Sequence, residues 1–285
     1  MKFTKMHGLG NDYIYINCLT EKHPTADWSV LAKKLSHRRF GIGSDGLICI
    51  GPSKIADFSM DMYNLDGSKS QMCGNGIRCV GKYVYDRGLT DKTTLTVESG
   101  GDVKTLELNL EQGKVKTVRV NMGRPILNPA EIPINAGGAH FINRPIEVLG
   151  QKYHITCISM GNPHAVCFLE DLEQIDIQTI GPAFETHPLF PERVNTEFIQ
   201  VLSPHALNMR VWERGSGETL ACGTGAAASL VAAVLNGLCE AQATVHLLGG
   251  DLEIHWDRDG TGCVFMTGPA VTVFEGEYVL TGETP

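Results

Sequence analysis

Short runs in which apolar and polar residues alternate predict most of the strands in this chain. The clearest runs are Tyr13–Ile16, Leu106–Leu110 and Lys116–Val120, and turns containing Gly or Asn join them. Successive side chains of a strand point to opposite faces, so a period of two indicates strands with one buried face. The pattern therefore predicts a fold rich in sheet.

Three other segments carry apolar residues at the spacing of a helix, namely residues 28–35, 76–87 and 225–236. The last is built almost entirely from small and apolar residues, is too short to span a bilayer and is followed by Gly237. Such a segment is typical of a central helix that sheet surrounds on all sides. Mixed strands with one buried helix in each half predict an α+β fold.

Two short segments look like copies of each other. Met72–Gly76 and Ala221–Gly225 each place a cysteine directly before a Gly-x-Gly turn that leads into one of the buried helices. Asn64 and Glu213 each lie nine positions before their cysteine, so the offset of 149 residues extends beyond the turn. An earlier Gly-Asn pair recurs at an offset of 151 residues. The repeat predicts two related domains.

Two connections containing Gly and Pro, residues 122–125 and 266–269, mark the expected crossings between the halves, because each follows a strand-like run and interrupts regular structure. We expect one domain to comprise residues 1–122 plus 269–285 and the other to comprise residues 123–268. The chain has 285 residues and 42% hydrophobic content, which is enough for two ordinary cores.

The net charge of the chain argues against two classes of binding partner, nucleic acids and membranes. A formal net charge of −8 and a pI near 5.7 provide no basic footprint for nucleic acid and no polybasic membrane patch. No segment approaches the roughly 18 apolar residues of a membrane span, and the first residues have no apolar signal core. We expect a cytoplasmic protein that acts on a small molecule and binds neither nucleic acid nor membrane.

The nine cysteines do not form a disulfide framework or a zinc signature, because their number is odd and no paired CxxC spacing occurs. Cys18, Cys49, Cys157 and Cys167 lie in apolar runs, where cysteine is typically a small core residue. The two cysteines of the repeat are different, because each is expected at the start of a helix.

A thiol at a helix N-terminus is biased toward the reactive thiolate, because the unpaired amide groups and the helix dipole favour negative charge. The same amides can hold a carboxylate, and the glycines around Asn75 and Thr224 let the backbone approach it closely. A carboxylate held by both helix starts would place its α-carbon between two sulfurs. That arrangement is typical of a two-base racemase or epimerase. A single Cys-Gly-x-Gly would more simply be a tight turn with a buried cysteine, but its duplication favours the catalytic interpretation.

Six segments, in this order, closely resemble the diaminopimelate epimerase family over nearly the whole chain. They are His7-Gly8-Leu9-Gly10-Asn11-Asp12, Asn64-x-Asp66-Gly67-Ser68, Met72-Cys73-Gly74-Asn75-Gly76-x-Arg78-Cys79, Met160-Gly161-Asn162-Pro163-His164, Pro191-Glu192-Arg193-Val194-Asn195 and Glu213-Arg214-Gly215-x-Gly217-Glu218-Thr219-x-Ala221-Cys222-Gly223-Thr224-Gly225. Six ordered matches are far more specific than any one motif.

The resemblance implies an epimerase that needs no pyridoxal phosphate, other cofactor or metal. It would interconvert LL- and meso-2,6-diaminopimelate, on the route to lysine and peptidoglycan. The family fold implied is two pseudo-symmetric domains, each a mixed, β-barrel-like sheet around a central helix, with the active site in the interdomain cleft. A homodimer is also implied.

The resemblance also implies roles for individual residues. Cys73 and Cys222 would be the catalytic acid and base, and His164 and Glu213 would support them. The reacting carboxylate and the rest of the substrate would be bound by Gly74, Asn75, Gly223, Thr224, Asn11, Asn64, Asn162, Asn195, Glu213 and Arg214. Arginine presents a planar donor fork that suits a second carboxylate, and asparagine can both donate and accept hydrogen bonds.

One position departs from the pattern of part of the family, which carries Gln where this chain has Gly46. The contact supplied by that side chain is therefore absent or replaced. The surrounding segment 41–46 matches G-x-G-x-x-G, but it follows a helix-like stretch and leads into a strand. A dinucleotide site needs the opposite order, so we reject that interpretation.

Three alternatives remain at the level of sequence. A proline or hydroxyproline racemase would share the fold and thiols but would not need Arg214 or the asparagines, and substrate length distinguishes it. A thiol hydrolase using one cysteine and His164 would leave the second cysteine unexplained, and trapping of an acyl-enzyme would reveal it. A protein that only binds diaminopimelate would tolerate Cys→Ser replacements.

Overall fold

The computed structural model describes residues 1–21, 26–70 and 74–279, and the chain divides into two compact units. The first unit comprises Met1–Val120 and Gly268–Pro285, and the second comprises Asn121–Thr267. That each unit is one half of an epimerase carrying one catalytic cysteine stays a prediction. Within the described residues, no helix combines the length and apolar character needed to cross a membrane.

The first unit is a mixed sheet with two helices. In chain order its elements are β1 (Lys2–Gly8), β2 (Asn11–Asn17), α1 (Trp28–Ser36), β3 (Gly46–Gly51), β4 (Phe58–Asn64), β5 (Lys69–Ser70), α2 (Gly74–Asp86), β6 (Thr94–Ser99), β7 (Asp102–Glu111), β8 (Lys114–Gly123, whose last residues enter the second unit) and β18 (Val271–Glu277).

The second unit repeats this succession of elements. They are β9 (Arg144–Val148), β10 (Gln151–Ser159), β11 (Pro163–Phe168), α3 (Ile177–Glu185), β12 (Asn195–Ser203), β13 (Ala206–Glu213), β14 (Gly217–Glu218), α4 (Gly223–Leu235), β15 (Gln242–Leu247), β16 (Gly250–Trp256) and β17 (Val264–Pro269, whose last residues belong to the first unit).

The strand pairings of the two units match one for one. In the first unit β1 pairs with β18 and β2, then β2 runs parallel to β3, β3 antiparallel to β4, and β4 parallel to β6, which pairs with β7. In the second unit β10 pairs with β9 and β11, and β11, β12, β13, β15 and β16 follow with the same directions. The α+β class and the pseudo-symmetric, sheet-around-helix architecture are therefore confirmed.

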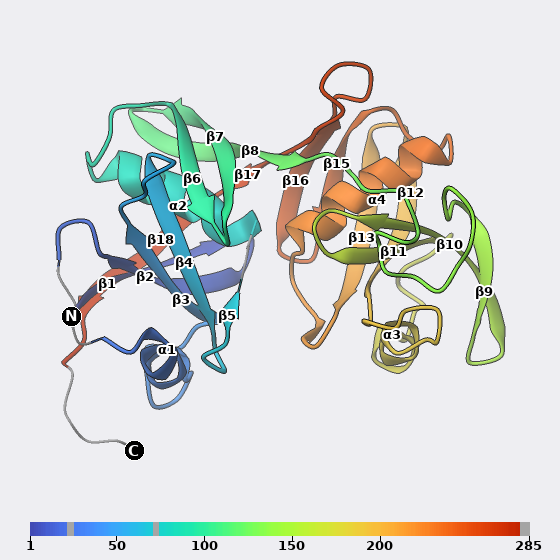
Figure 1. Cartoon of the computed structure of the whole chain (residues 1–285), viewed down its shortest axis with the longest axis horizontal. Coiled ribbons are helices and arrows are strands. Elements are labelled where there is room, and N and C mark those ends of the chain that lie inside the picture. Colours follow the sequence, from blue (N-terminus) through green and yellow to red (C-terminus); the bar gives the residue numbers. More distant parts are fainter. Residues whose placement is uncertain (22–25, 71–73, 280–285) are drawn as a thin grey trace. The chain divides into compact units, whose positions relative to one another are not determined.

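Helices α2 and α4 are the central helices of their units. Helix α4 packs against β10, β11, β12, β13, β15 and β16, and Figure 1 shows it in orange among those strands. Its alanines and glycines let strands approach from every side, and residues 225–233 are all buried. In α2 the close approach of strand β7 depends on Gly81, where an added Cβ would lie 2.9 Å from the side chain of Leu106.

Helices α1 and α3 cover the opposite face of each sheet. Asp27 and Asp176 cap their first turns, each accepting a hydrogen bond from a backbone amide. Helix α1 covers a cluster that includes Ile14, Ile16 and Leu47, and α3 covers the corresponding cluster in the second unit. The sequence pattern predicted α1, α2 and α4 but not α3.

Of the four cysteines expected in cores, three are buried, namely Cys49, Cys157 and Cys167. Cys18 is only partly buried, because it follows the end of β2, where the strand leaves the core. Helices α2 and α4 each begin two residues earlier than the pattern of apolar residues indicated. Those first two residues in each case belong to the repeated Cys-Gly-x-Gly segments.

Gly181 in α3 provides a test of this packing. An added Cβ would lie 2.4 Å from the ring of Trp212, whose indole N–H donates to Glu185 at 2.7 Å and so holds the ring in place. We expect Gly181→Ala to destabilise the second unit by about 1 to 3 kcal/mol through overpacking, which exceeds the helix preference for alanine.

Urea unfolding followed by tryptophan fluorescence measures this loss. Gly137→Ala is the matched control, because nothing lies within 4 Å of the added methyl and its φ is not positive. Equal stability of the two variants would contradict the close contact between α3 and Trp212.

Candidate functional site

The predicted site residues of each unit gather at one edge of its sheet. In the second unit β11 and β12 are parallel and begin at this edge, and β13, which is antiparallel to β12, ends there. Helix α4 begins at the same edge. Strands β2, β3 and β4 and helix α2 repeat the arrangement in the first unit. Polar residues at strand ends therefore lie beside the amide groups of a buried helix start.

Cys222 is the N-cap residue of α4 and is only 5% exposed. Its Sγ accepts a hydrogen bond from the backbone N–H of Gly225 at 3.3 Å and lies 3.5 Å from the Thr224 hydroxyl. Burial, followed by the charges of Glu213 and Glu197, raises the pKa of the Cys222 thiol well above its ordinary value, although these two hydrogen bonds oppose the shift. The thiol form is therefore favoured when the site is closed to water.

Glu213 lies at the end of β13 beside this thiol. Its carboxylate accepts a short hydrogen bond from the Thr219 hydroxyl. Burial is the main cause of a raised pKa at Glu213, and the hydrogen bonds from Thr219 and from the Cys222 thiol partly offset it. A carboxyl group that takes up a proton more readily than usual, within reach of a thiol, can exchange that proton with it.

His164 lies on β11 and is completely buried. Its Nδ1 lies 2.7 Å from Oε1 of Glu197, and its Nε2 lies 2.9 Å from Oδ1 of Asn162. Glu197, on β12, is completely buried as well. The imidazole is therefore held at both nitrogens, with its orientation set by a carboxylate on one side and by a predicted substrate residue on the other.

Asn195 and Arg214 are also brought together. The side chain of Asn195 donates to the carbonyl of Pro163 at 3.0 Å and accepts from the backbone N–H of Arg214 at 2.9 Å. The guanidinium of Arg214 donates to the carbonyl of Glu192 at 2.8 Å. Asn195 thus joins the start of β12 to the segment after β13, which carries the arginine.

In the first unit the corresponding helix start is described from Gly74 onward, and Cys73 lies outside the described residues. Asn75 is 3% exposed, and its side-chain oxygen accepts from Nη1 of Arg78 at 3.0 Å. The same guanidinium lies 3.3 Å from the carbonyl of Gly74 and donates through Nε to Pro269 at 3.1 Å. Arg78 is completely buried and holds the first turn of α2 in place.

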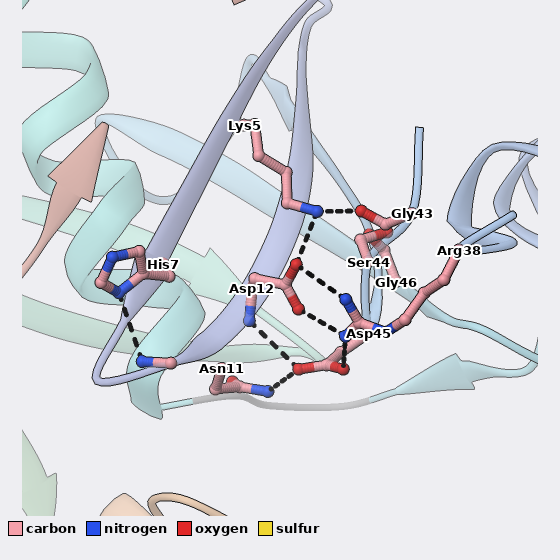
Figure 2. Close-up of polar contacts among 10 residues, drawn as sticks. Lys5, His7, Asn11, Asp12, Arg38, Gly43, Ser44, Asp45 and Gly46 are labelled. Atoms are coloured by element: carbon pink, nitrogen blue, oxygen red, sulfur yellow. Dashed lines mark hydrogen bonds and ion pairs between the residues drawn. The ribbon is translucent and has the colours of Figure 1, made fainter. Parts of the chain in front are cut away.

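Asn11 is held by a network of charged groups, which Figure 2 shows. Its side-chain amide donates to Oδ2 of Asp45 at 2.8 Å, and the same oxygen accepts the backbone N–H of Asp12 at 3.1 Å. Arg38 bridges the two carboxylates, with Nη2 2.8 Å from each. Lys5, which is buried, lies 2.5 Å from Asp12. The network therefore fixes the orientation of the Asn11 side-chain amide, whose nitrogen points toward Asp45.

The two carboxyl groups of this network differ. Burial would raise the pKa of Asp12, but hydrogen bonds from Arg38 and Lys5 outweigh it and hold that pKa below its ordinary value. For Asp45 burial prevails, assisted by the neighbouring charge of Asp12, and raises its pKa. Asp12 therefore keeps its negative charge between the two cations, whereas Asp45 takes up a proton more readily.

Asn64 ends β4 and donates to the Ser68 hydroxyl at 3.0 Å. It pairs in register with Gly46 on β3. A Cβ at Gly46 would lie 2.2 Å from the carbonyl of Tyr63, so this backbone conformation has no room for a side chain. The contact that glutamine supplies in part of the family is therefore not available from position 46.

Three residues that hold the predicted site were not singled out from the sequence, namely Glu197, Asp45 and Arg78. Arg78 lies in the segment Met72–Cys79 that resembles the family, four residues after Gly74. This spacing places it one turn further along the same face of the helix as Gly74. Glu197 carried no signal in the sequence, because apolar and polar residues do not alternate along β12 and its first five residues are all buried. Asp45 carried none beyond its place in a loop.

The same overall fold occurs in solved structures of low sequence identity. A probable proline racemase from Agrobacterium radiobacter K84 with bound carbonate matches 100% of this chain and 94% of its own, with a TM-score of 0.70 and 15% identity. A hydroxyproline epimerase from Agrobacterium vitis with bound trans-4-hydroxy-L-proline matches 100% and 92%, with a TM-score of 0.69 and 14% identity. At this identity the likeness concerns the fold alone.

Full-length relatives are much closer in sequence. Proteins named diaminopimelate epimerase from Acetivibrio thermocellus and Desulfovibrio desulfuricans are 57% and 54% identical, each over 98% of this chain and 99% of their own. One from Methanococcus maripaludis is 52% identical over 97% and 99%. The family model for diaminopimelate epimerase matches residues 3–128 and 156–273, which span both helix starts and their strand ends. The chain therefore belongs to the diaminopimelate epimerase family.

Proposed function

We propose that this protein is a cofactor-independent epimerase that interconverts LL- and meso-2,6-diaminopimelate by a two-base mechanism. The observation that carries the proposal is the buried Cys222 capping α4 beside Glu213, in a chain that belongs to this family. The family relatives are 51–57% identical to this chain, which favours diaminopimelate over the substrates of proline racemases that share only the fold.

The chemistry needs one thiolate and one thiol on opposite faces of the α-carbon. One sulfur removes the α-proton, the electron pair of the C–H bond passes into the carboxylate, and the other sulfur delivers a proton to the opposite face. Cys222 is one of these groups, and Cys73 is the other by its equivalence in the repeat.

The carbanion formed at the α-carbon is the species of highest energy that the site must stabilise, since no cofactor delocalises its charge. Backbone amides at the first turns of α2 and α4, at Gly74–Asn75 and Gly223–Thr224, can donate to the reacting carboxylate. These groups belong to the helix ends and need not reorganise as the negative charge grows. His164 and Glu213 support the thiol of Cys222 from the surrounding strands.

The second amino-acid end of the substrate needs both donors and acceptors. Asn11, Asn64, Asn162 and Asn195 supply amide groups at the strand ends, and Arg214 supplies a cationic fork for a carboxylate. Glu213 can also pair with an ammonium group of the substrate. We propose that the enzyme works in the cytoplasm as a homodimer, in the synthesis of lysine and peptidoglycan precursors.

The direct test is incubation of the protein with LL-diaminopimelate in deuterated water without added cofactor. We expect the meso form to appear with deuterium at the inverted α-carbon, because the delivered proton comes from a thiol that exchanges with solvent. Chiral chromatography with mass spectrometry follows both. Exchange of proline or hydroxyproline, without exchange of diaminopimelate, would favour the rival racemase.

Replacement of the thiols tests the two-base mechanism. We expect Cys222→Ser and Cys73→Ser each to lower the conversion rate by about 100- to 10,000-fold, because proton transfer in the transition state is lost. The double variant should be no slower than the slower single variant, since the two groups act as a unit. Cys263→Ser, at a partly exposed cysteine of the second unit, is the control and should retain activity. Full activity in either single variant would reject this mechanism.

Asp45 provides a test of the Asn11 network. We expect Asp45→Ala to raise the KM for diaminopimelate about tenfold with little change in kcat, since one hydrogen bond that orients Asn11 is lost. Steady-state kinetics in both directions measure the effect. Asp102→Ala is the control, because Asp102 is 79% exposed on β7. An unchanged KM would show that Asn11 does not need Asp45 for substrate binding.

A further inference from the structure

Glu197 is a completely buried carboxylate whose second oxygen has no hydrogen-bond partner among the described residues. Its first oxygen, Oε1, lies 2.7 Å from Nδ1 of His164. Burying a charged carboxylate is costly unless it is fully paired, and such a group usually has a reason to be where it is. Cys222, and not Glu197, caps α4.

The position of Glu197 places it against the start of α4. A methyl group built on Gly225 would lie 2.5 Å from Oε1 of Glu197 and 3.2 Å from Sγ of Cys222. The carboxylate and the thiol therefore both lie next to the Cα of Gly225, at the first turn of the helix. Glycine at this position gives the carboxylate room, because a methyl group would clash with it.

Three titratable groups surround the start of α4 on the strands packed against it, and two of them, the carboxyl groups, act on Cys222 directly. They are His164 on β11, Glu197 on β12 and Glu213 on β13. Strand β10 adds the buried thiol of Cys157, whose pKa burial raises and the charge of Glu197 raises further. The remaining charged residues of these strands are at least partly exposed, namely Lys152, His154, Arg210, His246, Asp251, Glu253 and His255.

At the strand position that corresponds to Glu197, the first unit carries the uncharged residue Ile48. Val166 and Glu197 pair in register on β11 and β12, and Tyr15 and Ile48 pair in register at the equivalent points of β2 and β3. The Tyr15 hydroxyl donates to the carbonyl of Gly76, in the first turn of α2, at 3.1 Å. A neutral hydroxyl and the buried guanidinium of Arg78 thus lie at one helix start, whereas a carboxylate and a histidine lie beside the other.

We propose that Glu197 is a positioning residue that orients His164 and, by its charge, keeps the thiol of Cys222 protonated in the resting protein. This inference rests on the proposed function, because it assigns a resting state to one of the two bases. A negative charge a few ångströms from a sulfur disfavours the thiolate, and a low-dielectric interior strengthens the effect. Glu197 thereby makes the two halves of the repeat electrostatically unequal.

Removal of the Glu197 charge should lower the pKa of the Cys222 thiol. Burial and the carboxylates of Glu213 and Glu197 raise the pKa of Cys222, so removal of one carboxylate lowers that pKa. Glu197→Gln removes the charge and keeps an oxygen that can accept from His164, so it separates charge from positioning. Glu197→Ala removes both.

The experiment measures the rate of alkylation of Cys222 by iodoacetamide between pH 6 and pH 10, with peptides resolved by mass spectrometry. We expect the midpoint for Cys222 to lie at least about one pH unit lower in Glu197→Gln than in the unmodified protein. Glu253→Gln, at an exposed glutamate on β16, is the matched control and should leave the midpoint unchanged. Urea unfolding verifies that each variant is folded.

An unchanged or higher midpoint in folded Glu197→Gln would overturn the proposal. So would the absence of Cys222 alkylation in that variant over the whole pH range. A purely structural role for Glu197 would lower stability in Glu197→Gln without moving the midpoint.

A second measurement connects the inference to turnover. In Glu197→Gln we expect the pH profile of kcat/KM to shift to lower pH with KM nearly unchanged, because a positioning residue acts through His164 and the Cys222 thiol and not on the substrate itself. In Glu197→Ala we expect an additional fall in kcat, since His164 loses its partner. Alkylation requires no turnover, so failure of the epimerase assay would count against the proposed function and not against the role of Glu197. A shifted midpoint without a shifted profile would reject the link to catalysis.

Discussion

The hydrogen bond from the Gly225 amide to the Cys222 sulfur is the interaction on which the described site depends. The first amides of a helix have no partner within the helix, and here a side chain with acid–base chemistry takes one of them. That bond is possible because α4 begins at the edge where β11 and β12 start and β13 ends. Strand ends supply polar side chains, and the helix supplies directed amides.

The central helix must be slender for this edge to form. Alanine and glycine along α4, and Gly81 in α2, let strands approach closely on several sides, which buries the helix and everything at its start. Burial then determines the electrostatics. It raises the pKa of Cys222 and of Glu213 and strengthens each charge that remains nearby. The packing that stabilises the unit therefore also sets the proton affinities of its reactive groups.

The two units share a topology but differ in the side chains that surround the start of the central helix. Their strand pairings correspond element by element, yet a tyrosine hydroxyl and the buried guanidinium of Arg78 hold the first turn of α2, whereas a histidine and a glutamate lie beside the first turn of α4. A reaction that removes a proton on one face and delivers one on the other needs groups in opposite protonation states. A duplicated scaffold with unequal charges is a simple physical way to provide such a difference.

The sequence by itself determined the α+β class, the internal repeat, the family and three of the four helices in the described part of the chain, because periodicity, glycine placement and motif order are local properties. It did not predict α3, whose interior contains Pro182 and whose glycine is needed only because Trp212 lies against it. Only the tertiary structure decided that Asp45 holds Asn11 and that Arg78 holds Asn75. It alone placed Glu197 between His164 and the start of α4. These partners are 3 to 34 residues apart, and the longer contacts depend on strand register and burial, which no local pattern encodes.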